Sequence, residues 1–275
     1  MTSKNGKIRL GIIGCGAIGS RIALSTKEEL KRKFTLTALY DIDNSKAQIL
    51  SRRFSSPVKV TASLNHLIGC CDVVVEAVNT SATCEIVKCA LKAGKSVMAM
   101  SVGRLLENDS LLSLADRSKG DLLLPSGAIA GIDAVKAAAV LGIKTMILTS
   151  TKPCSGFTNN VYVLKRRLLE GGIQKDVVLF DGHVRDAVKY FPQNINVAAT
   201  LALAAGKKVN FRVRVIASST IKRNRHEIVL EGKFGCIRTT SENTICPDNP
   251  KTSYLAVLSG IRTLQGFATH VKVGT

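Results

Sequence analysis

Short apolar runs alternate with helical spacing along the first 125 residues. The runs predict strands at residues 10–13, 34–40, 58–60, 72–78, 96–100 and 121–124. Between them, apolar positions recur at helical intervals over residues 17–30, 44–54, 81–93 and 105–118. The run 72–78 is almost wholly apolar, so we expect it to be buried on both faces of a sheet. Alternation of this kind predicts an α/β fold with a doubly wound parallel sheet.

The pattern changes after residue 125. Strand-like segments follow at residues 145–151, 177–184, 210–216, 226–234 and 237–240, with helical spacing only at 133–141 and 196–205. Residues 210–215 alternate between apolar and polar, which predicts one buried and one wet face. We therefore expect an α+β second domain, residues 126–249, with a mixed or antiparallel sheet. A last helix over 252–267 is expected to pack on the first domain, so that residues 1–125 are completed by a C-terminal helix within 250–275.

A glycine-rich turn joins the first predicted strand to the first helix. Gly14, Gly16 and Gly19 have the spacing G-x-G-x-x-G, and Asp41 ends the next strand about 20 residues further on. The first glycine permits the tight turn, the second lets backbone approach a pyrophosphate, and the third lets the helix pack on the strand. The pattern predicts a Rossmann-type site for a dinucleotide, held by Gly14, Gly16, Ala17, Ile18, Gly19 and Asp41.

Asp41 also bears on which dinucleotide is bound. Its carboxylate would pair with the ribose hydroxyls of NAD and repel the 2′-phosphate of NADP. Lys46, Arg52 and Arg53 follow closely and would weaken that preference. We expect NAD as the cofactor, with NADP left open.

Composition is that of an ordinary globular protein. Hydrophobic residues make up 45% of the chain, and no apolar run approaches the roughly 20 residues of a membrane span. The first residues lack the apolar segment of a secretory signal, so we expect a cytoplasmic protein that does not bind membranes. The eight cysteines show no paired C-x-x-C pattern. We expect them to be buried small hydrophobes rather than metal ligands, with Cys15 open to oxidation inside the glycine turn.

The net charge of +19 raises the alternative of nucleic-acid binding. The 39 Lys and Arg residues are spread out, however, and only 4% of the chain is aromatic, with no Trp for base stacking. We expect no nucleic-acid partner, and a surface that attracts anionic ligands such as dinucleotides and dicarboxylates. An exposed sheet in the second domain would suit a homodimer or higher oligomer.

A dinucleotide domain followed by a sheet domain suggests an oxidoreductase with its site in the cleft between them. Hydride transfer also needs a proton-handling group. His226 begins a strand and shares a face with Ile228 and Leu230, so its ring points toward apolar surroundings. That position fits a core histidine as well as a catalytic one. Asn194 and Asn196 open a helix, where they either cap it or bind the nicotinamide carboxamide or a substrate group.

Five segments together resemble the L-aspartate dehydrogenases. They are residues 14–19, 126–134, 191–201, 224–228 and 249–256. The first is generic, whereas the other four in this order are specific in combination. The resemblance implies that His226 is the active-site residue. It also implies that Asn196 contacts the cofactor together with an alanine, either Ala128 or Ala130.

The sequence departs from the family in two places. Ala130 stands where members often carry glycine, and Thr151–Lys152 stands where many carry an Arg-Lys pair. If that arginine holds a substrate carboxylate, Lys152 remains as a candidate for this role, with Asn194 as a further substrate contact.

The resemblance implies an NAD(P)-dependent reaction. L-aspartate would be oxidised to iminoaspartate, which yields oxaloacetate and ammonia or feeds NAD biosynthesis, and the reverse would be a reductive amination. His226, with an unperturbed pKa near 6.5, would accept the ammonium proton or activate water. The alternatives are a dihydrodipicolinate- or homoserine-type reductase on the same two-domain plan, a non-catalytic NAD-binding sensor and a nucleic-acid-binding protein.

Overall fold

The structure, a computed structural model, describes residues 6–78, 81–106, 108–170, 175–191, 196–206, 208–246 and 249–274. The chain divides into two compact units. The first comprises residues up to 125 together with 257–272, and the second comprises residues 126–256 with the last few residues of the chain. The C-terminal segment from residue 250 was expected to belong wholly to the first domain, whereas the structure divides it between the units.

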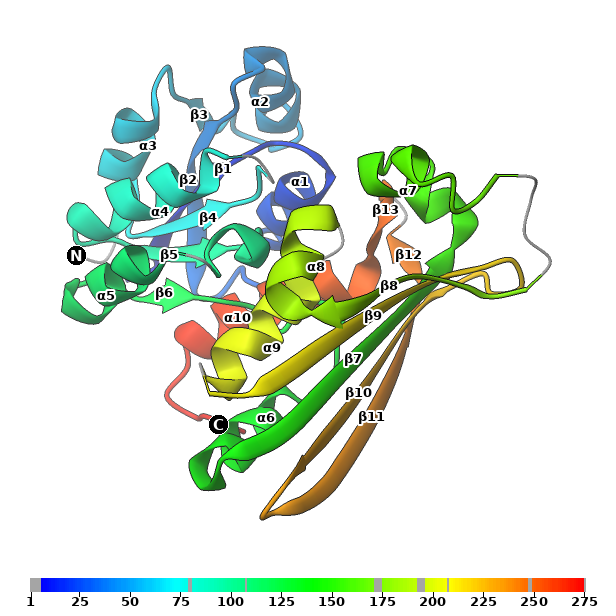
Figure 1. Ribbon diagram of the computed structural model, residues 1–275. Coiled ribbons are helices and arrows are strands. Elements are labelled where there is room, and N and C mark those ends of the chain that lie inside the picture. Colours follow the sequence, from blue (N-terminus) through cyan, green and yellow to red (C-terminus); the bar gives the residue numbers. More distant parts are fainter. Residues whose placement is uncertain are drawn as a thin grey trace. The chain divides into compact units, whose positions relative to one another are not determined.

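A parallel six-stranded sheet forms the centre of the first unit within the described residues, in the order β3-β2-β1-β4-β5-β6 (Figure 1). The strands are β1 (Ile8–Ile13), β2 (Phe34–Tyr40), β3 (Lys59–Val60), β4 (Val73–Glu76), β5 (Ser96–Ala99) and β6 (Leu122–Leu123). This order confirms the doubly wound sheet. Every residue of β4 is buried, as its unbroken apolar run predicted.

Helices connect these strands and pack on the sheet. They are α1 (Ala17–Ser25), α2 (Asn44–Ser51), α3 (Leu64–Cys70), α4 (Thr83–Lys92) and α5 (Asp109–Arg117). The helix predicted over 17–30 ends early because the hydroxyls of Ser25 and Thr26 donate to the carbonyls of Ile22 and Ala23. Likewise α5 begins later than expected, where Asn108 accepts the N–H of Leu111 as an N-cap.

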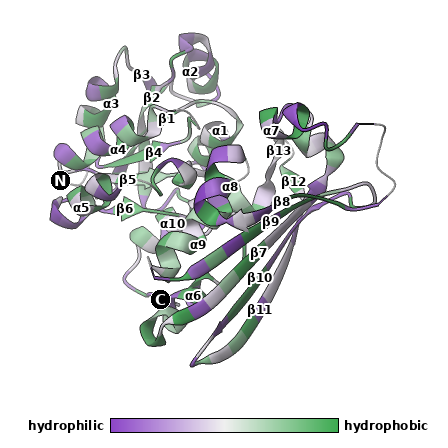
Figure 2. Ribbon diagram, in the orientation of Figure 1, coloured by the Kyte–Doolittle hydropathy of each residue, from purple (hydrophilic) through white to green (hydrophobic). Residues whose placement is uncertain are grey.

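The second unit is built on a mixed sheet of five strands in the described part of the chain, ordered β11-β10-β7-β9-β8. The pair β7–β9 is parallel and the other three pairs are antiparallel. The strands are β7 (Ile143–Pro153), β8 (Val177–His183), β9 (Asn210–Ser218), β10 (Asn224–Gly232) and β11 (Gly235–Asn243). Hydrophobic and hydrophilic residues alternate along these strands, so that one face of the sheet is buried (Figure 2).

A tight hairpin connects β10 and β11. The strands pair without interruption from Asn224–Asn243 to Gly232–Gly235, which leaves Lys233 and Phe234 as a two-residue turn. Sequence patterning predicted that the first of these strands would continue to residue 234, two residues too far.

The helices of the second unit are α6 (Ile132–Leu141), α7 (Val161–Lys165), α8 (Val184–Tyr190) and α9 (Asn196–Ala205). Helices α6 and α9 pack on each other, and α6 also contacts β10. The sequence did not predict α7, α8 or the small sheet of β12 (Ile245–Cys246) and β13 (Asn249–Ser253). The last helix, α10 (Tyr254–Phe267), starts at residue 254 rather than 252, because the preceding residues pair with β12, and it ends at residue 267 as predicted. Among the described residues, no helix has the length and apolar character required to cross a membrane.

Candidate active site

The glycine turn after β1 has the geometry that a dinucleotide requires. Gly14 has a positive φ of 91°, and a Cβ there would lie 2.6 Å from the carbonyl oxygen of Ala77. A Cβ on Gly19 would lie 1.8 Å from the Gly14 oxygen, so this glycine lets α1 close on the turn. A Cβ on Gly16 would meet nothing within 4 Å. That open space lies at the N-terminus of α1, before Ala17 and Ile18, where a diphosphate would bind the helix N–H groups.

Asp41 holds the turn in place. It follows the carboxyl end of β2, and its Oδ2 accepts the N–H of Cys15 at 2.6 Å while Oδ1 accepts that of Asp43 at 2.9 Å. The hydroxyl of Ser20 donates to the Cys15 carbonyl at 2.9 Å. The half-buried Asp41 carboxylate therefore sits against the turn itself, at the position from which a ribose would be bound.

The thiol of Cys15 is not a reactive group in this setting. It is 5% exposed, and burial raises its pKa to about 12, with the Asp41 charge acting in the same direction. The expected sensitivity of Cys15 to oxidation is thus wrong, because thiolates are the reactive form. All eight cysteines are free thiols, but only Cys15, Cys71 and Cys246 are buried as expected; Cys236 is exposed and the other four are half-buried.

Glu76, which sequence reasoning missed, organises the loops that follow β4 and β5. Its side chain is fully buried at the end of β4. Oε1 accepts the Val78 N–H at 2.9 Å and the hydroxyls of Thr83 and Ser101 at 3.0 Å, while Oε2 accepts the Ser101 N–H at 3.1 Å. These donors fix both loops at the carboxyl edge of the parallel sheet, where ligands of such folds bind.

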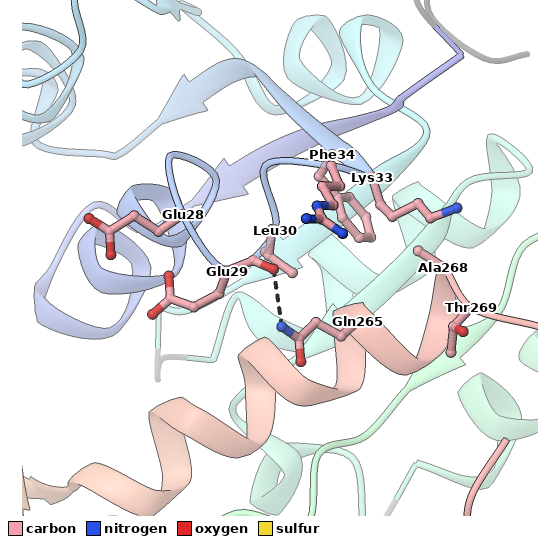
Figure 3. A pocket seen from close by; sticks show the side chains of 9 residues that line it. Glu28, Glu29, Leu30, Lys33, Phe34, Gln265, Ala268 and Thr269 are labelled. Carbon is pink, nitrogen blue, oxygen red and sulfur yellow. Dashed lines mark hydrogen bonds between the residues drawn. The ribbon is translucent and has the colours of Figure 1, made fainter. Parts of the chain in front are cut away.

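A pocket of about 180 Å³ in the first unit lies elsewhere. It is lined by residues between α1 and β2 and by the end of α10, where the Gln265 amide donates to the Glu29 carbonyl at 3.0 Å (Figure 3). No residue of the glycine turn lines it. In the described part of the chain, no three His, Cys, Asp or Glu side chains are grouped so as to hold a metal ion.

In the second unit, alternate residues of β11 hold the loop that precedes α6. The Asn243 amide donates to the Ala128 carbonyl at 2.8 Å, and the Ala130 N–H donates to the Ser241 hydroxyl at 3.0 Å. The Thr239 hydroxyl donates to the Ala130 carbonyl at 3.2 Å. Three side chains on one face of one strand therefore define the position of this loop.

The two alanines of this loop differ in accessibility. Ala128 is only 5% exposed, whereas Ala130 is exposed. Gly131, which follows, has a positive φ of 92°, and a Cβ there would lie 2.8 Å from the Thr239 methyl group. Only glycine fits this position without strain, so the loop is held close to β11 with Ala130 on its outer side.

His226 lies on the buried face of the sheet, as its same-face neighbours predicted. It is 3% exposed, and Ile228 and Leu230 next to it on that face are buried. Its Nδ1 is 2.9 Å from the hydroxyl of Ser150, which lies directly opposite on β7. Burial and, to a smaller extent, the charge of Lys152 lower the pKa of His226 to about 3. The pKa thus lies well below the unperturbed value near 6.5, because desolvation penalises the charged ring.

Lys152 lies on the same strand and face as Ser150, two residues further along. It is half-buried, and desolvation lowers its pKa to about 8. The adjacent Thr151, which replaces the arginine common in the resembling family, is buried with 6% exposure. Lys152 is thus a partly desolvated cation next to the imidazole, a setting suited to an anionic ligand.

The remaining predicted residues are Asn196 and Asn194. Asn196 is the first residue of α9 and is half-buried, and its carbonyl accepts the Thr200 hydroxyl at 3.0 Å. Asn194 lies outside the described residues. Sequence reasoning did not identify Ser150, Thr239, Ser241 or Asn243, because only strand register brings them to His226 and to the alanine loop.

Together these features define a class of protein. The first unit has the strand order and glycine turn of a dinucleotide-binding domain, and the second supplies a buried histidine beside a lysine. This is the plan of a two-domain NAD(P)-dependent oxidoreductase.

Comparison with known proteins identifies the family. The family described as "Aspartate dehydrogenase, C-terminal" matches residues 133–267, and "Homoserine dehydrogenase, NAD binding domain" matches residues 14–125. The L-aspartate dehydrogenase of Methanosarcina mazei is 41% identical over 98% of this chain and 100% of that protein. That of Methanococcus maripaludis is 38% identical, with the same coverage of both chains. The chain belongs to the L-aspartate dehydrogenase family.

A solved structure supports the fold. The crystal structure of aspartate dehydrogenase from Thermotoga maritima matches with a TM-score of 0.74 at 23% identity. The match covers 97% of this chain and 99% of that one. Both units therefore follow a known arrangement of secondary structure over nearly their whole length.

Proposed function

We propose that this protein oxidises L-aspartate at C2 with NAD(P) to give iminoaspartate. One observation carries the proposal: a buried His226 stands beside Ser150 and Lys152 in the unit whose sequence matches the C-terminal region of aspartate dehydrogenases. The homoserine dehydrogenase match is confined to the dinucleotide-binding part. It therefore gives no support to a homoserine-type substrate.

Lys152 is the proposed anchor for a substrate carboxylate. Its side chain is partly withdrawn from water, which lowers the pKa of the ammonium group to about 8 and strengthens its attraction for an anionic group. The negative charge of a dicarboxylate substrate would also offset the effect of Lys152 on the imidazole. The pKa of His226 would then rise in the loaded enzyme, toward a value suited to proton transfer. Asn194 is proposed as a further substrate contact.

His226 is the proposed proton acceptor. The substrate ammonium must lose a proton before C2 can be oxidised, and a neutral imidazole has a lone pair to take it, directly or through water. The nicotinamide, when bound, supplies the acceptor for the hydride from C2. Water then converts iminoaspartate to oxaloacetate and ammonia, unless the imine passes on to NAD biosynthesis. In the reverse direction the same residues would support reductive amination of oxaloacetate.

The cofactor contacts proposed in the second unit are Asn196 and Ala130. Of the two alanines, Ala130 is the accessible one, whereas Ala128 is buried. In the first unit, the Asp41 carboxylate favours NAD over NADP, because it would face a 2′-phosphate with like charge. Replacing Asp41 with Ser should raise the ratio of kcat/KM with NADP to kcat/KM with NAD.

The decisive experiment follows absorbance of the reduced nicotinamide with a panel of amino acids, and in reverse with oxaloacetate and ammonia. We expect strong turnover with L-aspartate only. His226→Ala should lower kcat by about 10²–10⁴-fold and leave the dissociation constant for NAD nearly unchanged. His66→Ala, on an exposed position of α3, is the matched control and should retain activity. A wild-type protein that binds NAD but turns over no amino acid would instead be a sensor.

We also propose that two copies associate through the open face of the five-stranded sheet. Ile147 is 39% and Val178 52% exposed on this face, near ion pairs of Asp181 with Arg212 and Arg214. Apolar residues exposed next to charged pairs suit a self-complementary interface. Light scattering should show a dimer that Ile147→Asp weakens.

We further propose that the protein works in the cytoplasm, where its eight free thiols would stay reduced.

A further inference from the structure

Ser150 and His226 form a buried polar contact in the candidate site. The Ser150 hydroxyl is 2.9 Å from Nδ1 of the ring, and the two residues are 4% and 3% exposed. They face each other in register across β7 and β10. Because both strands are central in the sheet, the ladder on each side fixes the backbone positions from which the two side chains extend.

This contact uses one nitrogen of the ring. A neutral imidazole has one N–H and one lone pair, and the hydrogen bond at one nitrogen decides where the proton resides. A ring that takes a proton from a substrate needs its lone pair on the nitrogen that faces the substrate. With Nδ1 against Ser150, that nitrogen is Nε2.

The charge of Lys152 matters here because it helps to keep the ring neutral, and only a neutral ring has two tautomers. Lys152 lies on the same face of β7, and its charge together with burial keeps the ring neutral. A doubly protonated ring would carry hydrogen on both nitrogens, and the hydrogen bond would then not select between them. In a neutral ring, the Ser150 hydroxyl either accepts the Nδ1–H or donates to a bare Nδ1, and only the first arrangement leaves the lone pair on Nε2.

We propose that Ser150 is a positioning residue for the dehydrogenation: its oxygen accepts the Nδ1–H of His226 and so places the lone pair on Nε2. This inference rests on the proposed function, since it assigns the nitrogen at which the substrate proton is taken. Nε2 gains one proton as the substrate ammonium loses one, and Nδ1–H donates to Ser150 throughout. In the reverse reaction Nε2 returns the same proton.

The first test is spectroscopic and needs no turnover. Long-range 1H–15N correlation spectra of 15N-labelled protein at pH 7 distinguish the two tautomers, and the loss of cross-peaks in His226→Gln identifies the signals of His226. We expect a protonated Nδ1 and a bare Nε2 in the wild type, and a changed tautomer distribution in Ser150→Ala. A wild-type ring protonated at Nε2 would overturn the inference.

The second test is kinetic. Ser150→Ala should lower kcat with aspartate by on the order of 10²-fold, with KM for NAD changed less than about twofold. Ser150→Thr keeps the hydroxyl and should recover most of the activity, which a general loss of packing would not allow. Thr149→Ala, the next residue with its side chain on the opposite face, is the matched control and should remain fully active.

The outcomes separate this inference from the proposed function. An active wild type with an equally active Ser150→Ala removes Ser150 from its role and leaves the proposed reaction standing. A wild type with no turnover of aspartate ends both. If Ser150→Ala unfolds, the tautomer of the wild-type ring decides the question, because a ring protonated at Nε2 overturns the inference and one protonated at Nδ1 supports it.

Discussion

The side-chain amide of Asn243 donates to the backbone carbonyl of Ala128, 115 positions earlier in the chain, at 2.8 Å. Asn243 is 3% exposed, so this bond is sheltered from water. It attaches the loop before α6 to the same strand whose Ser241 lies opposite His226. One strand thus sets the position of the proposed cofactor loop relative to the imidazole within this unit.

Removing the Asn243 amide should destabilise the protein. Asn243→Ala leaves the buried Ala128 carbonyl without its donor, which costs about 1–3 kcal/mol in the free energy of unfolding. Asn243→Asp should cost more at pH 8, because a carboxylate cannot donate and repels the carbonyl. Urea denaturation measures both, and KM for NAD should rise in both variants. Thr240→Ala, an exposed neighbour on the opposite face, should change stability by about 0.5 kcal/mol or less. Equal stability of Asn243→Ala and Thr240→Ala would contradict the role of this bond.

Two glycines of the first turn should respond differently to the same change. Gly16 has φ −72°, which any residue adopts, and open space where its Cβ would lie. Gly16→Ala should therefore keep wild-type stability within about 1 kcal/mol, yet weaken NAD binding about tenfold or more by blocking the approach of the diphosphate. Gly19→Ala should lower stability by at least about 1–3 kcal/mol, because its Cβ meets backbone. Calorimetric titration and thermal unfolding separate the two effects. Wild-type NAD affinity in Gly16→Ala would exclude the turn as the binding site.

Glu76→Gln, a nearly isosteric change, should still be harmful. The N–H groups of Val78 and Ser101 donate to different oxygens of the carboxylate. In either orientation of the glutamine amide, its NH2 group would face one of these N–H donors. We expect a loss of about 1–3 kcal/mol in the free energy of unfolding. Glu85→Gln, whose side chain is 63% exposed, is the control. A Glu76→Gln variant as stable as this control would show that the carboxylate is not needed.

The ionisation of His226 gives a prediction for pH. Its folded-state pKa, about 3, lies below the unfolded value near 6.5. Between these values the unfolded chain binds a proton at His226 that the folded chain does not, so stability falls as pH falls from 6.5 to 3. His226→Gln should show a shallower loss of stability over this range in urea titrations. An unchanged slope would mean that the ring is protonated in the fold.

The charge on Lys152 should also affect the pKa of His226. Lys152→Met removes the cation and should raise the pKa of His226, which nevertheless stays below 6.5 because burial is the larger cause. NMR titration of the His226 signals measures the shift directly. Lys144→Met, an exposed position on the same strand, is the control and should leave His226 unaffected.

Local pattern was sufficient for much of the fold. The glycine turn, the parallel sheet and the buried face of His226 follow from spacing and alternation, which depend only on near neighbours. The sequence did not predict helices α7 and α8 or strands β12 and β13, because such short segments contain too few repeats of the hydrophobic pattern to be recognised.

The residues that contact His226 could not be predicted from the sequence, for a different reason. Ser150 is 76 positions away in the chain. Alternation within one strand does not determine which residue of another strand will lie opposite. The pKa of the ring depends on the same long-range packing, which places it in apolar surroundings next to Lys152. A pattern can therefore predict the face of the strand on which His226 lies without giving the pKa of its ring.

The length of the turn formed by Lys233 and Phe234 determines which residues of β10 and β11 lie opposite each other. Side chains along a strand alternate between faces, so a shift of one residue exchanges the two faces. An insertion of one amino acid in this solvent-facing turn would move Ser241 out of line with His226 and detach Asn243 from Ala128. Homologues are therefore free to vary the composition of this hairpin loop, but a change in its length would have to be matched by a compensating bulge further along β11.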